Sequence, residues 1–325
     1  MSQEILRLIE SLPEPQTISP SNEPEFYGAV YVLAEQCGIT SAVPYAPKSW
    51  LHGWIYKPIE YVREILFWGE KRDINLVHTT EQATFLQERG YPYTYAIGAP
   101  FTYVPKSKAT RIANSVLVMP PHCTRTTHQH FDELVYLEAL SEALDAFEHV
   151  LFCIHPHDAE SGSWIENLGR LGYPFILGAT VEDKAALKRI RYLFDSVEVV
   201  TSPNLGSHIP YAGFCGCRVS VFGPKPTVDL KGYAGDAWSI SNWEIVEKAV
   251  EWQNSDQART LYPQLYKSPS EAQLQKEWSR LILGEANRQC LQEVSKHFGW
   301  SLAARLKDYF TGKRYAFPMW PVTRS

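Results

Sequence analysis

The chain has 325 residues, which is enough for two domains of ordinary size, each with its own core. Hydrophobic residues make up 45% of the chain and charged residues 21%, and this balance excludes a disordered protein. The net charge of −5 argues against a nucleic-acid binder, because such proteins normally carry a basic surplus.

The opening stretch, MSQEILRLIESLPEPQ, is amphipathic and charged and has no apolar core segment of the kind found in a signal peptide. No stretch of the sequence approaches the roughly 18 apolar residues that a membrane span needs. The six cysteines include no CxxC pair. These features predict a reduced, cytoplasmic protein.

The first hundred residues alternate apolar runs with helical stretches. Residues 74–92, INLVHTTEQATFLQERGYP, predict a short strand, a helix with a threonine cap, and a glycine-containing stop. Residues 93–105 predict another extended run. The polar and basic segment 105–113 predicts a linker.

After this linker, strands and helices alternate regularly. The apolar runs predict strands over 114–122, 149–156, 173–178, 196–202 and 218–223. The segments between them predict helices over 131–148, 162–172, 181–194 and 205–216. Such alternation is typical of a parallel, doubly wound sheet, and from about Ser241 the chain is expected to be mainly helical.

Polar residues follow several of the predicted strands. His122, His155, Thr201 and Ser202 each stand at the end of one. In open α/β sheets, ligands bind beyond the carboxyl ends of the strands. These residues are therefore expected to share one site.

The stretch VVTSPNLGSHIPYAGFCG, 199–216, has the features of a phosphate site. Gly206 allows a ligand to approach the backbone, Ser207 stands at the mouth of a short helix, and free N–H groups at such a helix end suit an anion. The alternative is an ordinary helix capped by Ser207 or Asn204.

The stretch VLFCIHPHD, 150–158, allows three interpretations. As a phosphate site it needs only His155, with Pro156 fixing its loop. As a surface loop it needs no ligand at all. As a metal site it would use the histidines and the aspartate near this strand end: His155, His157 and Asp158, with His122, His128 and His130.

The stretch SWLHGWIYKP, 49–58, contains a candidate base. His52 precedes Gly53 and is flanked by Trp50 and Trp54. A neutral imidazole could take a proton from a hydroxyl acceptor, and the indole rings could hold the face of a sugar. The alternative is a packed turn with a structural histidine. Gly-rich nucleotide loops and a GxSxG elbow are absent from the sequence.

The order of these motifs resembles GT-B fold glycosyltransferases of bacterial surface polysaccharide synthesis. More narrowly, it is similar to the cytidine-nucleotide branch: capsule sialyltransferases, Kdo transferases and teichoic acid polymerases. Those families carry a His-Pro pair after a strand of the second domain, here His155-Pro156, and a Ser/Thr-rich stretch that opens a later helix, here 201–212. Teichoic-acid-type members add a His-Gly pair, here His52-Gly53.

The resemblance implies an α/β protein with two Rossmann-like domains whose parallel sheets face each other across a cleft, followed by a helical C-terminal segment. Residues 1–108 would form the acceptor-side domain, and residues 109–285 the nucleotide-sugar-binding domain. Residues 286–325 would be helices that pack back on the first domain.

The resemblance also implies roles for single residues. His52 would be the base, and His155 would stabilise the departing phosphate. No metal or other cofactor is expected. The partners would be a CMP- or CDP-linked sugar and a glycan or glycolipid acceptor at the inner face of a membrane, with peripheral association there. The donor site would consist of His155, Pro156, Thr201, Ser202, Gly206, Ser207 and His208, with His122 and Arg125 as further phosphate contacts.

Two other functions remain open on the sequence. One is a metal-dependent hydrolase that uses the histidine clusters. The other is a nucleotide-sugar or glycan-binding protein without a catalytic base.

Overall fold

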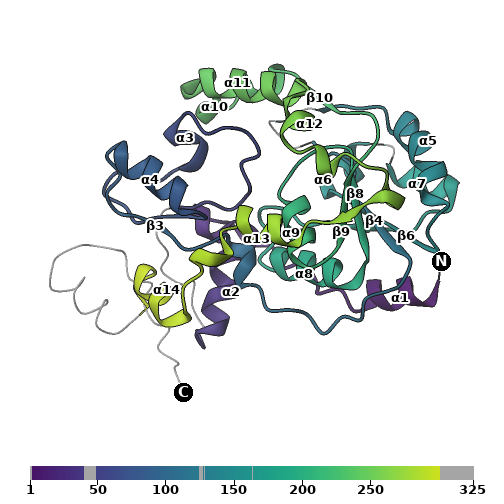
Figure 1. Cartoon of the computed structure of the whole chain (residues 1–325), viewed down its shortest axis with the longest axis horizontal. Helices are drawn as coiled ribbons and strands as arrows, with labels where there is room; N and C mark the ends of the chain where they lie inside the picture. Colours follow the sequence, from purple (N-terminus) through teal and green to yellow (C-terminus); the bar gives the residue numbers. More distant parts are fainter. Residues whose placement is uncertain (1, 40–48, 124–126, 128, 163, 301–325) are drawn as a thin grey trace.

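The computed structural model describes residues 2–39, 49–123, 127, 129–162 and 164–300, and it belongs to the α/β class (Figure 1). Two separate sheets form the framework, one of three parallel strands and one of six strands that are parallel except at one edge. The predicted α/β class and the parallel strands are therefore confirmed. The division into domains 1–108, 109–285 and 286–325 stays a prediction.

The smaller sheet comes from the first hundred residues. Its strands are β1 (Ser49–Trp50), β2 (Asn75–Val77) and β3 (Thr94–Ala96), all parallel, with β2 in the centre. Helix α4 (Thr80–Glu88) connects β2 to β3. The predicted threonine cap is Thr79, whose side chain accepts a hydrogen bond from the N–H of Gln82, so the helix begins where the sequence indicates.

The larger sheet has the strand order β11-β9-β8-β4-β6-β7. Neighbouring strands run parallel except β11, which is antiparallel to β9. Its strands are β4 (Ser115–Val118), β6 (His149–Ile154), β7 (Phe175–Leu177), β8 (Val199–Ser202), β9 (Arg218–Val221) and β11 (Gln273–Leu274). The first five lie inside the ranges predicted from the sequence, whereas β11 was not predicted.

The strand order reverses at β4. The chain proceeds from β4 to β6 and β7 on one side, and then returns to β8 and β9 on the other side. A crevice forms at such a switch point beyond the carboxyl ends of the strands, and ligands of doubly wound sheets bind there.

Helices cover the larger sheet, and most of them match the predicted ranges. They are α5 (Glu133–Leu144), α6 (Pro156–Ser161), α7 (Trp164–Leu171), α8 (Ala186–Ser196) and α9 (His208–Phe214). A single apolar core connects the two sheets, since buried Trp50 and Leu76 from the small sheet belong to the same cluster as Leu117 and Leu151 from the large one.

The N-terminal segment packs against the second half of the chain. It consists of α1 (Gln3–Glu10), η1 (Glu23–Gly28) and α2 (Ala29–Gln36). The backbone N–H of Ile18 donates to the carbonyl of Glu182 at 2.8 Å. Gly28 has a φ of +75°, and a Cβ atom there would lie 1.8 Å from the carbonyl oxygen of Lys184. Only glycine fits this close approach, so Gly28 seats the segment against the loop that precedes α8.

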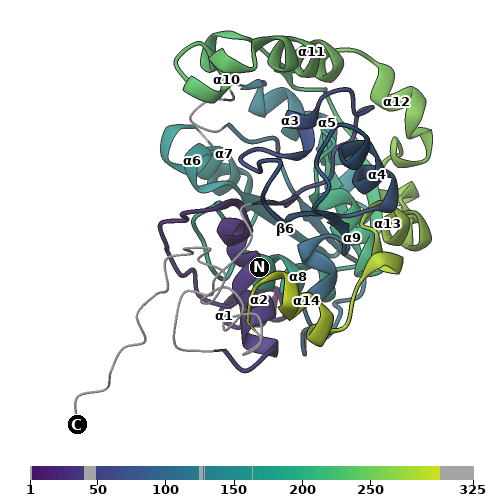
Figure 2. The same ribbon diagram turned by 90° about the vertical axis from the view of Figure 1, so that its left-hand side faces the viewer.

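The C-terminal third is mainly helical, as predicted, and it touches the first half. In both views α10 and α11 lie together above α3 (Figures 1 and 2). The Trp238 ring stacks on the Phe67 ring at 4.5 Å between centroids. In the first half, α3 spans Val62–Ile65 and η2 spans Pro100–Tyr103.

Strand β10 (Thr227–Val228) pairs with β5 (Gln129–His130) in a separate two-stranded sheet. The other elements of the C-terminal third are η3 (Lys231–Tyr233), α10 (Ala237–Ser241), α11 (Trp243–Asn254), α12 (Gln257–Leu261), η4 (Pro263–Leu265), η5 (Pro269–Glu271), α13 (Lys276–Ile282), η6 (Glu285–Asn287) and α14 (Leu291–His297).

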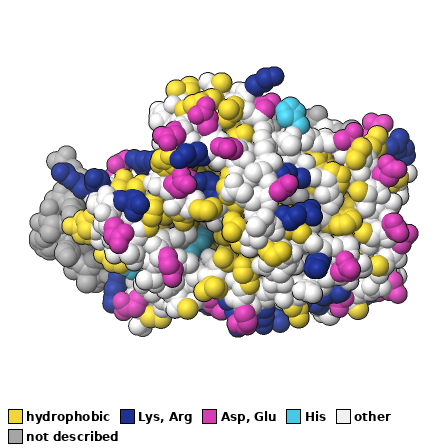
Figure 3. Space-filling view, turned by 45° about the horizontal axis from the view of Figure 1, so that its top comes forward, with side chains coloured by type: hydrophobic (Ala, Val, Ile, Leu, Met, Phe, Trp, Pro, Cys, Tyr) yellow, Lys and Arg dark blue, Asp and Glu magenta, His cyan; other side chains and the backbone are white. Residues whose placement is uncertain are grey.

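Charge on the surface is mixed. On the face drawn in Figure 3, acidic and basic side chains lie among one another rather than in a field of one sign. Among the described helices, none combines the length and the apolar character needed to cross a membrane.

Candidate functional site

One cavity of about 420 Å³ lies where the carboxyl ends of the two sheets meet. His52 and Gly53 line it from the small sheet, just after β1. His122 and His155 line it from the large sheet, after β4 and β6. The segment between β8 and α9 completes the wall with Asn204, Leu205, Gly206, Ser207 and His208. The cavity therefore occupies the switch point of the large sheet.

The two halves of the site touch directly. The backbone N–H of Trp54 donates to Oγ of Ser207 at 2.8 Å, and the hydroxyl of Tyr211 donates to the carbonyl of His52 at 2.7 Å. A Cβ atom on Gly53 would lie 2.8 Å from Oγ of Ser207, so a larger residue there would displace the serine side chain. Ser207 still has its own hydroxyl proton to donate, because it acts as the acceptor toward Trp54.

A buried carboxylate stands behind His52. Nδ1 of His52 lies 3.6 Å from Oε1 of Glu23, and the Glu23 side chain is 2% exposed. The Ser49 hydroxyl donates to the other oxygen of Glu23 at 2.7 Å, which fixes the carboxylate. A carboxylate facing Nδ1 favours the tautomer with its proton there, and this leaves Nε2 as the free basic nitrogen.

Aromatic rings hold the imidazole of His52. The Phe26 ring lies 5.5 Å from it, edge-on, and the Tyr27 ring lies 5.8 Å away. Tyr27 has a φ of +56°, which is uncommon for a residue other than glycine. Non-glycine residues with positive φ cluster at functional sites, because the surrounding structure must hold them there.

The imidazole of His155 is held in one orientation. It caps α6, and its Nδ1 accepts a hydrogen bond from the N–H of His157 at 3.3 Å. Because Nδ1 is the acceptor, Nε2 carries the proton of the neutral ring and is a donor. Burial, together with neighbouring His122 and His157, lowers the pKa of His155 to about 4.

Two further histidines complete a neutral cluster. The His122 ring stacks on the His155 ring at 4.8 Å, and burial lowers the pKa of His122. Burial lowers the pKa of His208 to about 3, with a smaller contribution from His122. Nε2 of His208 is buried and has no hydrogen-bond partner among the described residues. The cluster therefore offers polar N–H groups to a ligand. A bound anion would favour the protonated form of these histidines.

Other predicted site residues do not line this cavity. Thr201 and Ser202 are fully buried, and their hydroxyls donate to Oγ of Ser220 and Oδ1 of Asn204. Pro156 opens α6 behind His155. Arg125 and His128 lie outside the described residues. Within these residues, no group of three or more histidine, cysteine, aspartate and glutamate side chains is arranged to hold a metal ion.

The structure also adds residues that the sequence did not reveal. Glu23 and Tyr27 come from the segment before the small sheet, and Tyr211 comes from the middle of α9. The stretch SNEPEFYG, 21–28, contains two carboxylates and two aromatic rings, but nothing in it indicates which strand end it meets.

Comparisons of this chain with family models, with curated proteins and with solved structures found no match. The resemblance to glycosyltransferases therefore rests on the motifs themselves. Of those motifs, His-Gly, the histidine of His-Pro and the Gly-Ser before α9 all line the cavity.

Proposed function

We propose that this protein is a glycosyltransferase that moves a sugar from a nucleotide-sugar donor, with CMP- or CDP-linked sugars favoured, to a hydroxyl group of a growing surface glycan. The observation that carries the proposal is the pairing of His52 with Glu23 across one cavity from the histidine cluster of His122, His155 and His208. Such a transfer needs two parts: a base for the acceptor hydroxyl, and a set of hydrogen-bond donors that face the departing phosphate.

In this reaction, Nε2 of His52 removes the proton of the acceptor hydroxyl. The acceptor oxygen forms a bond to the anomeric carbon, and the bond from that carbon to the donor phosphate breaks. The electron pair departs on the phosphate oxygen. Nε2–H of His155 and the hydroxyl of Ser207 donate hydrogen bonds to this oxygen or its neighbours, which stabilises the charge that develops there.

The geometry favours an enzyme over a binding protein without a base. A binding protein would have no need for a buried carboxylate behind a cavity histidine, since burying a charge costs free energy unless it is paired. Glu23 is buried, and it is held by the Ser49 hydroxyl in the position where it faces His52.

The test is hydrolysis or transfer by the purified full-length chain, supplied with CMP- and CDP-sugars in the presence and absence of glycan acceptors. Release of free nucleotide that depends on both His52 and His155 supports the proposal. A protein that binds the nucleotide but releases none with any acceptor is a binding protein. Activity that is lost with a stoichiometric metal on chelation indicates the hydrolase.

A further inference from the structure

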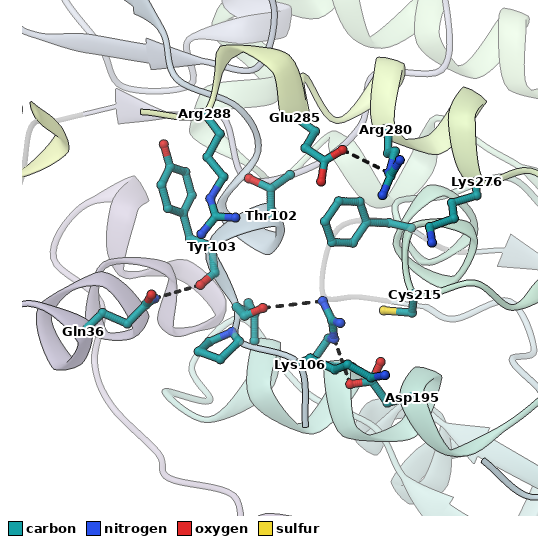
Figure 4. A pocket seen from close by; sticks show the side chains of 14 residues that line it. Gln36, Thr102, Tyr103, Lys106, Asp195, Cys215, Lys276, Arg280, Glu285 and Arg288 are labelled. Carbon is teal, nitrogen blue, oxygen red and sulfur yellow. Dashed lines mark hydrogen bonds and ion pairs between the residues drawn. The ribbon is translucent and has the colours of Figure 1, made fainter. Parts of the chain in front are cut away.

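A second hollow lies at the other end of α9. Ser207 and His208 at the start of the helix line the cavity described above, whereas Phe214 and Cys215 at its end line a hollow of about 470 Å³ (Figure 4). Its other walls come from α2, η2 and the segment that follows it, α8, α13 and η6. No lining residue is common to this hollow and the histidine-lined cavity, so it is a separate site.

A neighbouring hollow of about 380 Å³ extends it. The two share Lys106, Asp195, Cys215 and Lys276, so they form one continuous groove. We call it the basic groove, because it is lined by six cationic side chains and two acidic ones: Lys106, Arg111, Arg191, Lys276, Arg280 and Arg288, with Asp195 and Glu285. Six minus two leaves four positive charges, on a chain whose net charge is −5.

Both acidic side chains are already engaged. Oδ2 of Asp195 accepts from Nε of Arg191 at 2.9 Å and from the N–H of Ser107 at 2.8 Å. Glu285 pairs with Arg280 at 3.1 Å. Among the described residues, the four surplus cations have no carboxylate partner: they are Lys106, Lys276, Arg288 and Arg111. The Arg111 guanidinium donates only to backbone carbonyls.

Neighbouring groups hold two of the surplus cations, Arg288 and Arg111, in place. The Arg288 guanidinium lies over the Tyr103 ring at 5.0 Å from its centroid. Arg111 donates to the carbonyls of Phe194, Cys215 and Gly216. Figure 4 shows Arg288, Arg280 and Lys276 reaching over the hollow from one side, opposite Lys106 and Asp195. Gathering like charges costs free energy, and a bound anion would offset that cost.

We propose that the basic groove binds a small ligand with two linked phosphate groups. Lys106 and Lys276 belong to both hollows, whereas Arg288 lies in one and Arg111 in the other. A ligand with two adjacent anionic groups can therefore meet the lysine pair and one arginine at each end. The planar guanidinium of arginine can donate two parallel hydrogen bonds to phosphate oxygens, and the lysine ammonium adds a compact positive charge.

The test is calorimetric titration of the full-length chain with pyrophosphate and, separately, with orthophosphate at low salt. Pyrophosphate is expected to bind at least tenfold more tightly. Lys276→Gln removes one cation and should weaken pyrophosphate binding about tenfold, the loss typical of a hydrogen bond to a charged group. Arg288→Gln should do the same. Both side chains are exposed, so the variants are expected to fold.

Two control variants make the result specific. Lys108→Gln removes an exposed lysine that lines neither hollow and should leave the affinity unchanged. His155→Asn alters the histidine-lined cavity and reports separately on any pyrophosphate that binds there. Equal affinity for the two anions, or equal losses in Lys276→Gln and Lys108→Gln, would overturn the proposal. So would a loss confined to His155→Asn, which would place pyrophosphate in the histidine-lined cavity instead.

Discussion

Nδ1 of His52 lies 3.6 Å from Oε1 of Glu23, although no pattern in the sequence indicates that these two segments meet. The distance is slightly longer than a hydrogen bond, and such contacts often tighten only when substrate binds. The pair gives His52 what a general base needs, a fixed ring and a carboxylate that stabilises the imidazolium formed during proton transfer.

Glu23→Gln should lower turnover by roughly tenfold or more and leave nucleotide affinity nearly unchanged. The amide keeps the shape of the side chain and an acceptor for Ser49, but it cannot stabilise a protonated His52. Turnover and calorimetric affinity, measured on one preparation, separate the two effects.

Glu25→Gln is the matched control. Glu25 is also buried, but its carboxylate accepts hydrogen bonds from Ser21 and Asn22, and among the ion pairs of the described residues the partner of His52 is Glu23. Equal losses of turnover in Glu23→Gln and Glu25→Gln would show that Glu23 only supports the local fold.

His155→Asn should weaken nucleotide binding about tenfold and lower turnover further, because a donor to the phosphate is lost. Asparagine is a good N-cap residue and can still accept the N–H of His157, so the start of α6 is kept. His155→Ala removes the cap as well, which costs about 1 kcal/mol more in stability. Near-normal affinity in a folded His155→Asn protein would exclude His155 from the phosphate site.

Acid should destabilise the fold between pH 6.5 and pH 4. The pKa of His155 is lowered to about 4 and that of His208 to about 3, whereas the unfolded chain has its histidines near 6.5. The unfolded state therefore binds more protons in this range, so this stabilisation is complete above pH 6.5 and is lost as the pH falls toward the folded pKa values.

Urea denaturation at pH 7, 6 and 5 measures this effect. His208→Gln removes one of the buried histidines whose pKa is lowered, and the free energy of unfolding should then depend less steeply on pH. An unchanged slope in that variant would mean that His208 is not a buried neutral imidazole.

Gly53→Ala should disturb the contact between the two halves of the site. The added methyl group would lie 2.8 Å from Oγ of Ser207, so the serine must move and the hydrogen bond from Trp54 must weaken. We expect weaker nucleotide binding and slower transfer with only a small change in melting temperature. Gly169→Ala is the control, because a Cβ atom at that helical position meets no atom within 4 Å. If Gly53→Ala binds and turns over like Gly169→Ala, the contact has no role in the site.

Much of the large sheet could be predicted from the sequence. Apolar runs such as Ser115–Val118 and Val199–Ser202 are buried throughout, which is what a strand covered on both faces requires. His122 and His155 could be placed in one site because parallel strands bring their carboxyl ends to one edge.

The remaining parts of the site depend on contacts between distant segments. Thr201 and Ser202 stand at a strand end like the histidines, but their hydroxyls turn to Ser220 and Asn204 in the interior. Glu23 lies beside His52 in a segment whose Gly28 packs closely against Lys184, a contact between residues far apart in the sequence. The two-residue strand β1, which places His52, is too short to leave a periodic pattern.

The most direct test of the central claim is a thermal-shift panel with CMP, CDP, UDP, GDP and TDP on the wild-type chain and on His155→Asn. A nucleotide at 100 times its dissociation constant stabilises the folded state by about 2.7 kcal/mol. That gain raises the melting temperature by several degrees, roughly 2–4 °C for each kcal/mol in a protein of moderate size. We predict such a rise with CMP or CDP for the wild type and a clearly smaller rise for His155→Asn. No rise with any of the five nucleotides, or an equal rise in both proteins, would contradict the central claim.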